Sequence, residues 1–239
     1  MTVAPQTDLE LDGATLRKHG HAVLEKLVRW VDQTPERPVL RTDGSVRAAG
    51  RMKEDAPEDG VPFRRLLARL VNEVLPVGLD PASPGYLAFI PGGGLPHAAL
   101  ADLLTNVANR YTGLWRPAPA LVQLEVSVLR WLCDWVGFTG PEAGGVLTSG
   151  GSIANLSGIV AAREAANVDD LRTLVAYSTA QAHNSVVKSA RTAGLKAAQV
   201  KVVPHTTDFR MDVAALARMV DDDRSAGRQP FLVVANAGC

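Results

Sequence analysis

A glycine-rich turn between an apolar run and an amphipathic run is the part of this sequence best suited to hold a small anion. The turn reads TSGGS at residues 148–152, and it connects a predicted strand at 145–148 to a predicted helix that starts just after Ser152. We expect Ser152 to be the N-cap of this helix, while Gly150 and Gly151 let a ligand approach the backbone closely. Free N–H groups and the positive end of the helix dipole make such a turn suitable for a phosphate group.

A capped helix with a glycine turn and no ligand is the simpler interpretation of the same residues. The turn is not followed by the Gly-Lys-Ser/Thr of a P-loop, and it lacks the G-x-G-x-x-G spacing of a dinucleotide-binding turn. The turn is therefore compatible with a phosphate group but matches neither of these nucleotide-binding motifs.

His183 is the second candidate, since it lies between the next apolar run and the amphipathic run that follows. The carboxyl ends of parallel strands meet at one edge of a sheet, so we expect His183 to share an edge with the glycine turn. A surface or capping role is the alternative for a lone histidine. A third turn follows the apolar run at 231–236 and consists of small residues, which are typical of close packing or of a ligand site.

These turns belong to a pattern of short apolar runs that alternate with amphipathic runs. The apolar runs TLVAY, VKVV and FLVVAN occupy residues 173–177, 200–203 and 231–236. Predicted helices separate them at 152–166, 185–194 and 211–227. Apolar strands connected by helices are typical of a mostly parallel sheet covered on both faces, so this half is predicted to be α/β.

The first half of the sequence is predicted to be mainly helical. Amphipathic patterns predict helices at residues 15–32, 63–75, 97–111 and 120–138. The stretch 33–62 is rich in Pro, Gly and charged residues and is predicted to be a long loop. The stretch 81–96 is too dense in Pro and Gly for regular structure.

The composition describes a folded protein without a dominant charge. Hydrophobic residues make up 46% of the 239 residues, and 25 Lys and Arg residues balance 25 Asp and Glu residues. This balance favours neither nucleic acid nor a membrane as a partner. Two cysteines do not suggest a disulfide framework, and the first residues lack the apolar region of a secretory signal. We expect a cytoplasmic protein without a metal site.

The order of these segments resembles the group II decarboxylases that depend on pyridoxal 5'-phosphate (PLP), the family of aromatic-L-amino-acid, tyrosine, histidine and glutamate decarboxylases. The resemblance covers most of the chain and rests on the N-terminal helices, SPGYLAFIPGGGLPHAALADLL, LWRPAPALVQLEVSVLRWL, LTSGGSIANLSGIVAAR, AYSTAQAHNSVVKSARTAGL and FLVVANAG. It implies an incomplete large domain of a PLP-dependent transferase of fold type I. The implied limits are 1–95 for a helical N-terminal segment with a substrate-side loop and 96–239 for the PLP-binding domain.

The resemblance also implies roles for the residues of the two turns. Gly150, Gly151 and Ser152 match the turn that holds the cofactor phosphate. His183 matches a histidine that stacks on the pyridine ring and helps to place or protonate the reacting substrate, so it is expected to be both cofactor-binding and catalytic. Asn155, one helical turn further on, is expected to support the loop.

Two further positions are expected to border the substrate. Gly92 and Trp115 match segments that line the substrate side in the family, often across a dimer interface, so a homodimer is implied. A core or interface aromatic is the alternative for Trp115. The implied reaction is the decarboxylation of an L-amino acid, with aromatic amino acids favoured.

The sequence departs from the family pattern in several places. It contains no His-Lys pair, and the family's cofactor lysine and its aspartate partner of the pyridine nitrogen would both lie beyond residue 239. Ile153 stands where the family often has Glu, and Cys239 stands where Thr is common. We therefore expect an N-terminal fragment that is inactive and poorly soluble alone.

Two other functions stay open at this stage. Because a fold does not fix a reaction, the same fold and cofactor would also serve an aminotransferase or another lyase. A non-catalytic interaction remnant is the alternative from a different class, and the absence of the cofactor lysine from these residues is its support.

Overall fold

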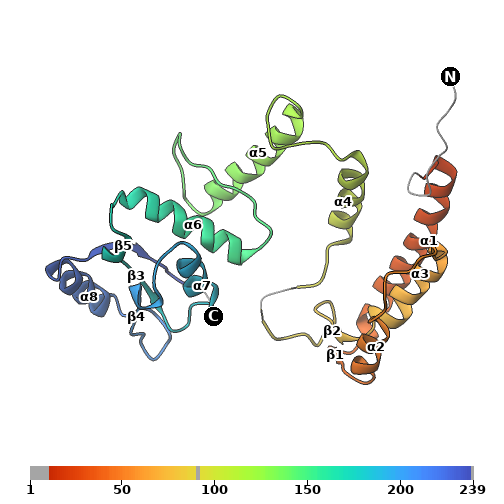
Figure 1. Ribbon diagram of the computed structural model, residues 1–239, viewed down its shortest axis with the longest axis horizontal. Helices are drawn as coiled ribbons and strands as arrows, with labels where there is room; N and C mark the ends of the chain where they lie inside the picture. The colour runs from red at the N-terminus through yellow and green to blue at the C-terminus, as the bar shows by residue number, and fades with distance from the viewer. Residues whose placement is uncertain (1–10, 90–91, 238–239) are drawn as a thin grey trace. The chain divides into compact units, whose positions relative to one another are not determined.

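The computed structural model describes residues 11–89 and 92–237 of the chain. The chain divides into two compact units, residues 1–110 and residues 111–239. Figure 1 shows the helices and strands of both units. Within the described ranges, no helix is long and apolar enough to cross a membrane.

The first unit is mainly helical. Its elements are α1 (Gly13–Asp32), the short helix η1 (Thr34–Glu36), β1 (Leu40–Arg41), α2 (Ser45–Arg51), α3 (Phe63–Arg69), the π-helical turn η2 (Leu70–Val74), β2 (Gly78–Leu79) and α4 (Pro96–Ala108). The Asp12 side chain caps α1 by accepting a 2.6 Å hydrogen bond from the N–H of Thr15. β1 and β2 form an antiparallel pair in which Leu40 lies opposite Leu79.

The stretch between the first two predicted helices is more ordered than we expected. The prediction of one long loop at 33–62 is wrong, because η1, β1 and α2 lie within it. Arg37 accounts for part of this order, since its guanidinium lies 4.0 Å from the centre of the Trp30 ring and donates a 2.6 Å hydrogen bond to Asp80. A cation–π contact and an ion pair across distant residues are not visible in a local Pro and Gly count.

The second unit is an α/β domain with three parallel strands. Its elements are α5 (Pro119–Trp135), α6 (Gly151–Ala166), η3 (Leu171–Thr173), β3 (Leu174–Thr179), α7 (Ser185–Thr192), η4 (Ala197–Gln199), β4 (Val200–Val203), α8 (Val213–Ser225) and β5 (Gln229–Val233). The strand order is β4-β3-β5, and both pairs are parallel. The predicted parallel sheet is confirmed.

The central strand β3 is buried on both faces, which explains its unbroken apolar sequence. Leu174 and Ala176 pack in one core cluster with residues of α6 and α7. Val175 and Tyr177 pack in a second cluster with Met219 and other residues of α8. Because successive side chains of a strand point to opposite faces, this division places α8 on one side of the sheet and α6 and α7 on the other (Figure 1).

The predicted strand at 145–148 is wrong. These residues form no regular element, and Val146 and Leu147 are 65% and 56% exposed. A strand is defined by ladder hydrogen bonds to a neighbour, and no strand of the described residues pairs with this run. The apolar pattern alone could not show whether a neighbouring strand was present.

Candidate functional site

Helix α6 begins earlier in the glycine turn than the sequence predicted. Gly150 is the N-cap, with φ of 151°, and no side chain caps the helix. The N–H groups of Ile153 and Ala154 both donate to the Gly150 carbonyl at 3.1 Å. Ser152 is therefore the second residue of the helix, and our prediction that it is the N-cap is wrong. A glycine can adopt the backbone conformation of this position, which Ser adopts rarely.

The same turn offers free backbone donors. Within the described residues, the N–H groups of Gly151 and Ser152 take part in no hydrogen bond. A Cβ atom added to Gly150 or Gly151 would meet no atom within 4 Å, so the space in front of the turn is open. Two free N–H groups at the positive end of a 16-residue helix fit a phosphate group.

His183 lies beyond the carboxyl end of β3, in the loop before α7. Its Nδ1 atom is 2.8 Å from the hydroxyl of Ser185 and accepts a 3.2 Å hydrogen bond from the N–H of that residue. The Ser185 hydroxyl also accepts a 2.8 Å hydrogen bond from the side-chain amide of Asn155. Asn155 lies one turn into α6, so His183 is connected to the helix that starts at the glycine turn.

Packing between α6 and α7 brings the two candidate regions together. The hydroxyl of Ser189 on α7 donates a 3.2 Å hydrogen bond to the carbonyl of Ser152. With the contact from Asn155 to Ser185, this gives two hydrogen bonds between the start of α6 and α7. The structure thus places the glycine turn and His183 around one helix pair.

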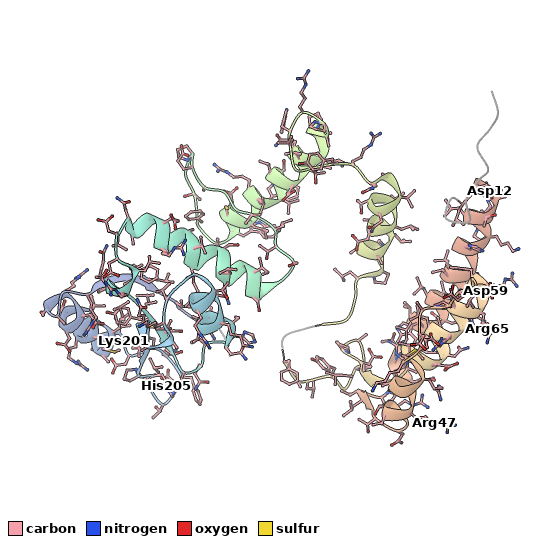
Figure 2. The ribbon with its side chains drawn as sticks, in the orientation of Figure 1. Asp12, Arg47, Asp59, Arg65, Lys201 and His205 are labelled. Atoms are coloured by element: carbon pink, nitrogen blue, oxygen red, sulfur yellow. The ribbon has the colours of Figure 1, made fainter. Side chains whose placement is uncertain are left out.

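A cavity of about 320 Å³ lies at the carboxyl edge of the sheet. Its lining comes from the ends of β3 and β5 and from the loop after β4: Thr179, Gln181, Asp208, Phe209, Arg210, Met211, Ala235 and Asn236. His205, labelled in Figure 2, lies in the same loop and is 3.5 Å from Gln181 through its Nε2 atom. Ligands commonly bind at this edge of a parallel sheet.

The two other predicted residues, Trp115 and Gly92, take part in none of the hydrogen bonds described above. Trp115 lies in the second unit before α5 and is 55% exposed. Gly92 lies in the first unit, where a Cβ atom on it would meet nothing within 4 Å. The expected contact of Gly92 and Trp115 with substrate stays a prediction. The described ranges hold no group of three or more His, Cys, Asp and Glu side chains that could bind a metal ion.

Ser185, which joins His183 to Asn155, was not among the residues predicted from the sequence. Ser185 is 3% exposed and contacts both His183 and Asn155. Its position two residues after His183, at the start of a predicted helix, was the available signal. Serine in that position usually caps its own helix, so the contact with the histidine became visible only in the structure.

A match to a family model, which spans parts of both units, decides which family the chain belongs to. Residues 48–239 match the family model described as the pyridoxal-dependent decarboxylase conserved domain. The chain belongs to this family. The expected family and the dependence of the family on a pyridoxal cofactor are thereby confirmed.

Curated members of the pyridoxal-dependent decarboxylase family resemble the chain over nearly all of its length. An aromatic-L-amino-acid decarboxylase of Bacillus atrophaeus is 30% identical over 231 residues, which are 97% of this chain and 48% of the relative. An aromatic-L-amino-acid decarboxylase of Catharanthus roseus is 28% identical and covers 95% of this chain. The chain spans about half the length of these relatives.

Solved structures of the family share the fold, which confirms the expected fold class. The Oryza sativa TDC with PLP and tryptamine superimposes with a TM-score of 0.84 at 27% identity, over 97% of this chain and 49% of that one. A Catharanthus roseus tryptophan decarboxylase in complex with L-tryptophan gives the same TM-score and identity over 93% of this chain and 50% of that one.

Proposed function

We propose that the complete protein decarboxylates an L-amino acid with PLP as its cofactor, and that aromatic amino acids are its preferred substrates. The glycine turn carries this proposal, since it offers free N–H groups of Gly151 and Ser152 beside a helix pair that also holds His183. Membership of the family supports it. The relatives named as aromatic-L-amino-acid and tryptophan decarboxylases support the choice of substrate class.

The residues of this chain would bind and orient the reacting groups. The N–H groups of Gly151 and Ser152 would bind the phosphate, and His183 would lie against the pyridine ring with its Nε2 atom available to hold or move a proton. Bound PLP supplies an electron-accepting ring for the electron pair left by departing CO2. Gly92 and Trp115 would border the substrate.

We also propose a homodimer in the cytoplasm, with the substrate site near the contact between subunits. Helix α5 exposes several large apolar side chains, among them Leu124, Trp131 and Trp135. These exposed side chains support the proposal that α5 packs against a further partner. Large exposed apolar surface on a helix is typical of a contact surface.

Incubation of the complete protein with PLP and a panel of amino acids tests the reaction. We expect PLP to bind and CO2 to be released from an aromatic amino acid faster than from acidic or basic ones. Amino transfer to a keto acid without CO2 release would instead indicate an aminotransferase. A protein that binds no PLP would contradict both enzymatic functions and favour the interaction remnant.

A further inference from the structure

One ring nitrogen of His183, Nδ1, accepts a hydrogen bond from a group that can only donate. The N–H of Ser185 donates to Nδ1 over 3.2 Å. A backbone N–H can only donate, so Nδ1 must present its lone pair to it. In this arrangement Nδ1 carries no proton.

A second group contacts Nδ1 in a compatible way. The hydroxyl oxygen of Ser185 lies 2.8 Å from Nδ1 and accepts a 2.8 Å hydrogen bond from Nδ2 of Asn155. An amide nitrogen also only donates, so the oxygen uses one lone pair toward Asn155. Because the backbone N–H already leaves Nδ1 without a proton, the hydroxyl hydrogen of Ser185 is the one that points toward Nδ1. Ser185 is 3% exposed, which limits competition from water for these contacts.

The free nitrogen of the ring must then carry the proton. A neutral imidazole has one N–H, and with Nδ1 as an acceptor this N–H is at Nε2. Among the described residues, Nε2 of His183 has no hydrogen-bond partner. The ring lies beyond the carboxyl end of β3, so its N–H is available at the edge of the sheet where we propose that the cofactor binds.

We propose that Asn155 and Ser185 are positioning residues that hold His183 in the Nε2–H tautomer. The chain of donors runs from Asn155 on α6, through Ser185 at the start of α7, to the histidine in the preceding loop. Its value for catalysis rests on the proposed function, because only a bound substrate or cofactor would use the Nε2 proton. The tautomer itself is a property of this chain and can be measured without either.

Replacing Asn155 with Asp reverses the direction of the hydrogen bond between residue 155 and the Ser185 hydroxyl, while the side chain keeps almost the same shape. A carboxylate only accepts, so it takes the hydroxyl hydrogen of Ser185 and leaves a lone pair of that oxygen facing Nδ1. Asn155→Asp should therefore favour the Nδ1–H tautomer. Ser185→Ala removes the hydroxyl but keeps the backbone N–H, so it should give a smaller change in the same direction.

The direct readout is the ¹⁵N spectrum of the ring nitrogens in the complete protein without PLP, at a pH where the ring is neutral. The signals of His183 are identified by their loss in His183→Gln. We expect unprotonated Nδ1 and protonated Nε2 in the wild type, with both signals shifted toward each other in Asn155→Asp. Asn184→Asp is the matched control, because it places the same charge next to His183 while its side chain makes no hydrogen bond among the described residues.

A wild-type protein with the proton on Nδ1, or equal spectra for Asn155→Asp and Asn184→Asp, would overturn the proposal. If Asn155→Asp does not fold, an unchanged tautomer in Ser185→Ala would overturn it as well. Measurements of PLP binding and activity distinguish a failure of the proposed function from a failure of the positioning role. If the spectra behave as expected but the protein binds no PLP, the proposed function fails and the positioning role stands; if both hold, Asn155→Asp should lower kcat at least about tenfold while PLP stays bound.

Discussion

The hydroxyl of Tyr177 donates a 2.6 Å hydrogen bond to the carboxylate of Asp223, and both side chains are fully buried between β3 and α8. The same carboxylate accepts 2.5 Å hydrogen bonds from Lys201 on β4 and from Arg228 just before β5. Figure 2 labels Lys201 in this unit. One carboxylate therefore connects α8 to all three strands of the sheet that positions His183.

Removal of this charge should destabilise the second unit. Asp223→Asn leaves Lys201 and Arg228, whose side chains are 30% and 42% exposed, without their shared anion, and the loss of hydrogen bonds to a buried charged group costs about 1.5–3 kcal/mol. Urea unfolding of the complete protein measures the loss. Asp222→Asn is the control, because Asp222 is exposed on the same helix and its change should stay within about 0.5 kcal/mol. Equal stabilities for the two variants would contradict the assigned role of Asp223.

The contribution of Asp223 should disappear in acid. Burial tends to raise the pKa of Asp223, but hydrogen bonds from Lys201, Tyr177 and Arg228 outweigh it and hold the pKa below the ordinary value of 3.8. A lowered pKa in the folded state stabilises the protein above pH 3.8, and this gain is lost as the pH falls through the lowered pKa. The difference in unfolding free energy between wild type and Asp223→Asn should therefore shrink as the pH falls below 3.8. A difference that stays constant down to about pH 2 would argue against this linkage.

The opposite dependence is expected for Tyr177 in alkali. Burial, together with the hydrogen bond to the Asp223 carboxylate, raises the pKa of the Tyr177 hydroxyl above its ordinary value of 10.0. The neutral hydroxyl then stabilises the fold below pH 10, and this gain is lost as the pH rises toward the raised pKa. Tyr177→Phe should be less stable than wild type near neutral pH by about 1 kcal/mol and should lose less stability in alkali. Parallel alkaline unfolding curves for the two proteins would contradict this.

The conformation of Gly150 should matter more than its small size. Its φ of 151° is strained for other residues, although a Cβ atom there would meet nothing within 4 Å. Gly150→Ala should cost about 1–3 kcal/mol of stability or move the start of α6. Gly158→Ala, in the middle of the same helix and equally open, should instead stabilise by about 0.5–1 kcal/mol. Thermal unfolding of both variants checks the contrast, which fails if the two alanines act alike.

Regular elements of the second unit were predictable from the sequence because their patterns are local. The strand predicted at 200–203 has the observed bounds of β4, and the helix predicted from residue 152 begins at Gly151. The apolar runs are too short for helices, and amphipathic runs lie between them. These two features were sufficient to predict the strands and helices. The run at 145–148 has the same local pattern, but a strand also needs a neighbour, which the pattern cannot supply.

The side-chain contacts of the site depended on packing between distant segments. Thirty positions separate Asn155 from Ser185, and only the packing of α6 on α7 brings them together. Asp223 closes a run of three aspartates, which resembles a solvated helix face, yet it is the one turned toward the sheet. The N-cap at Gly150 was missed because a sequence does not report φ, and Ser152 has the residue type that usually caps a helix.

Binding of PLP at the glycine turn tests the central claim most directly, and two substitutions at Gly151 isolate the backbone donor. Gly151 is the first residue of α6, where proline is well tolerated, and the extended ψ of 169° at Gly150 suits a following proline. Gly151→Pro removes the N–H, whereas Gly151→Ala keeps it. We predict that Gly151→Pro weakens the affinity of the complete protein for PLP at least about tenfold relative to Gly151→Ala, with the same helix content. Equal PLP affinity in the two variants would contradict the account.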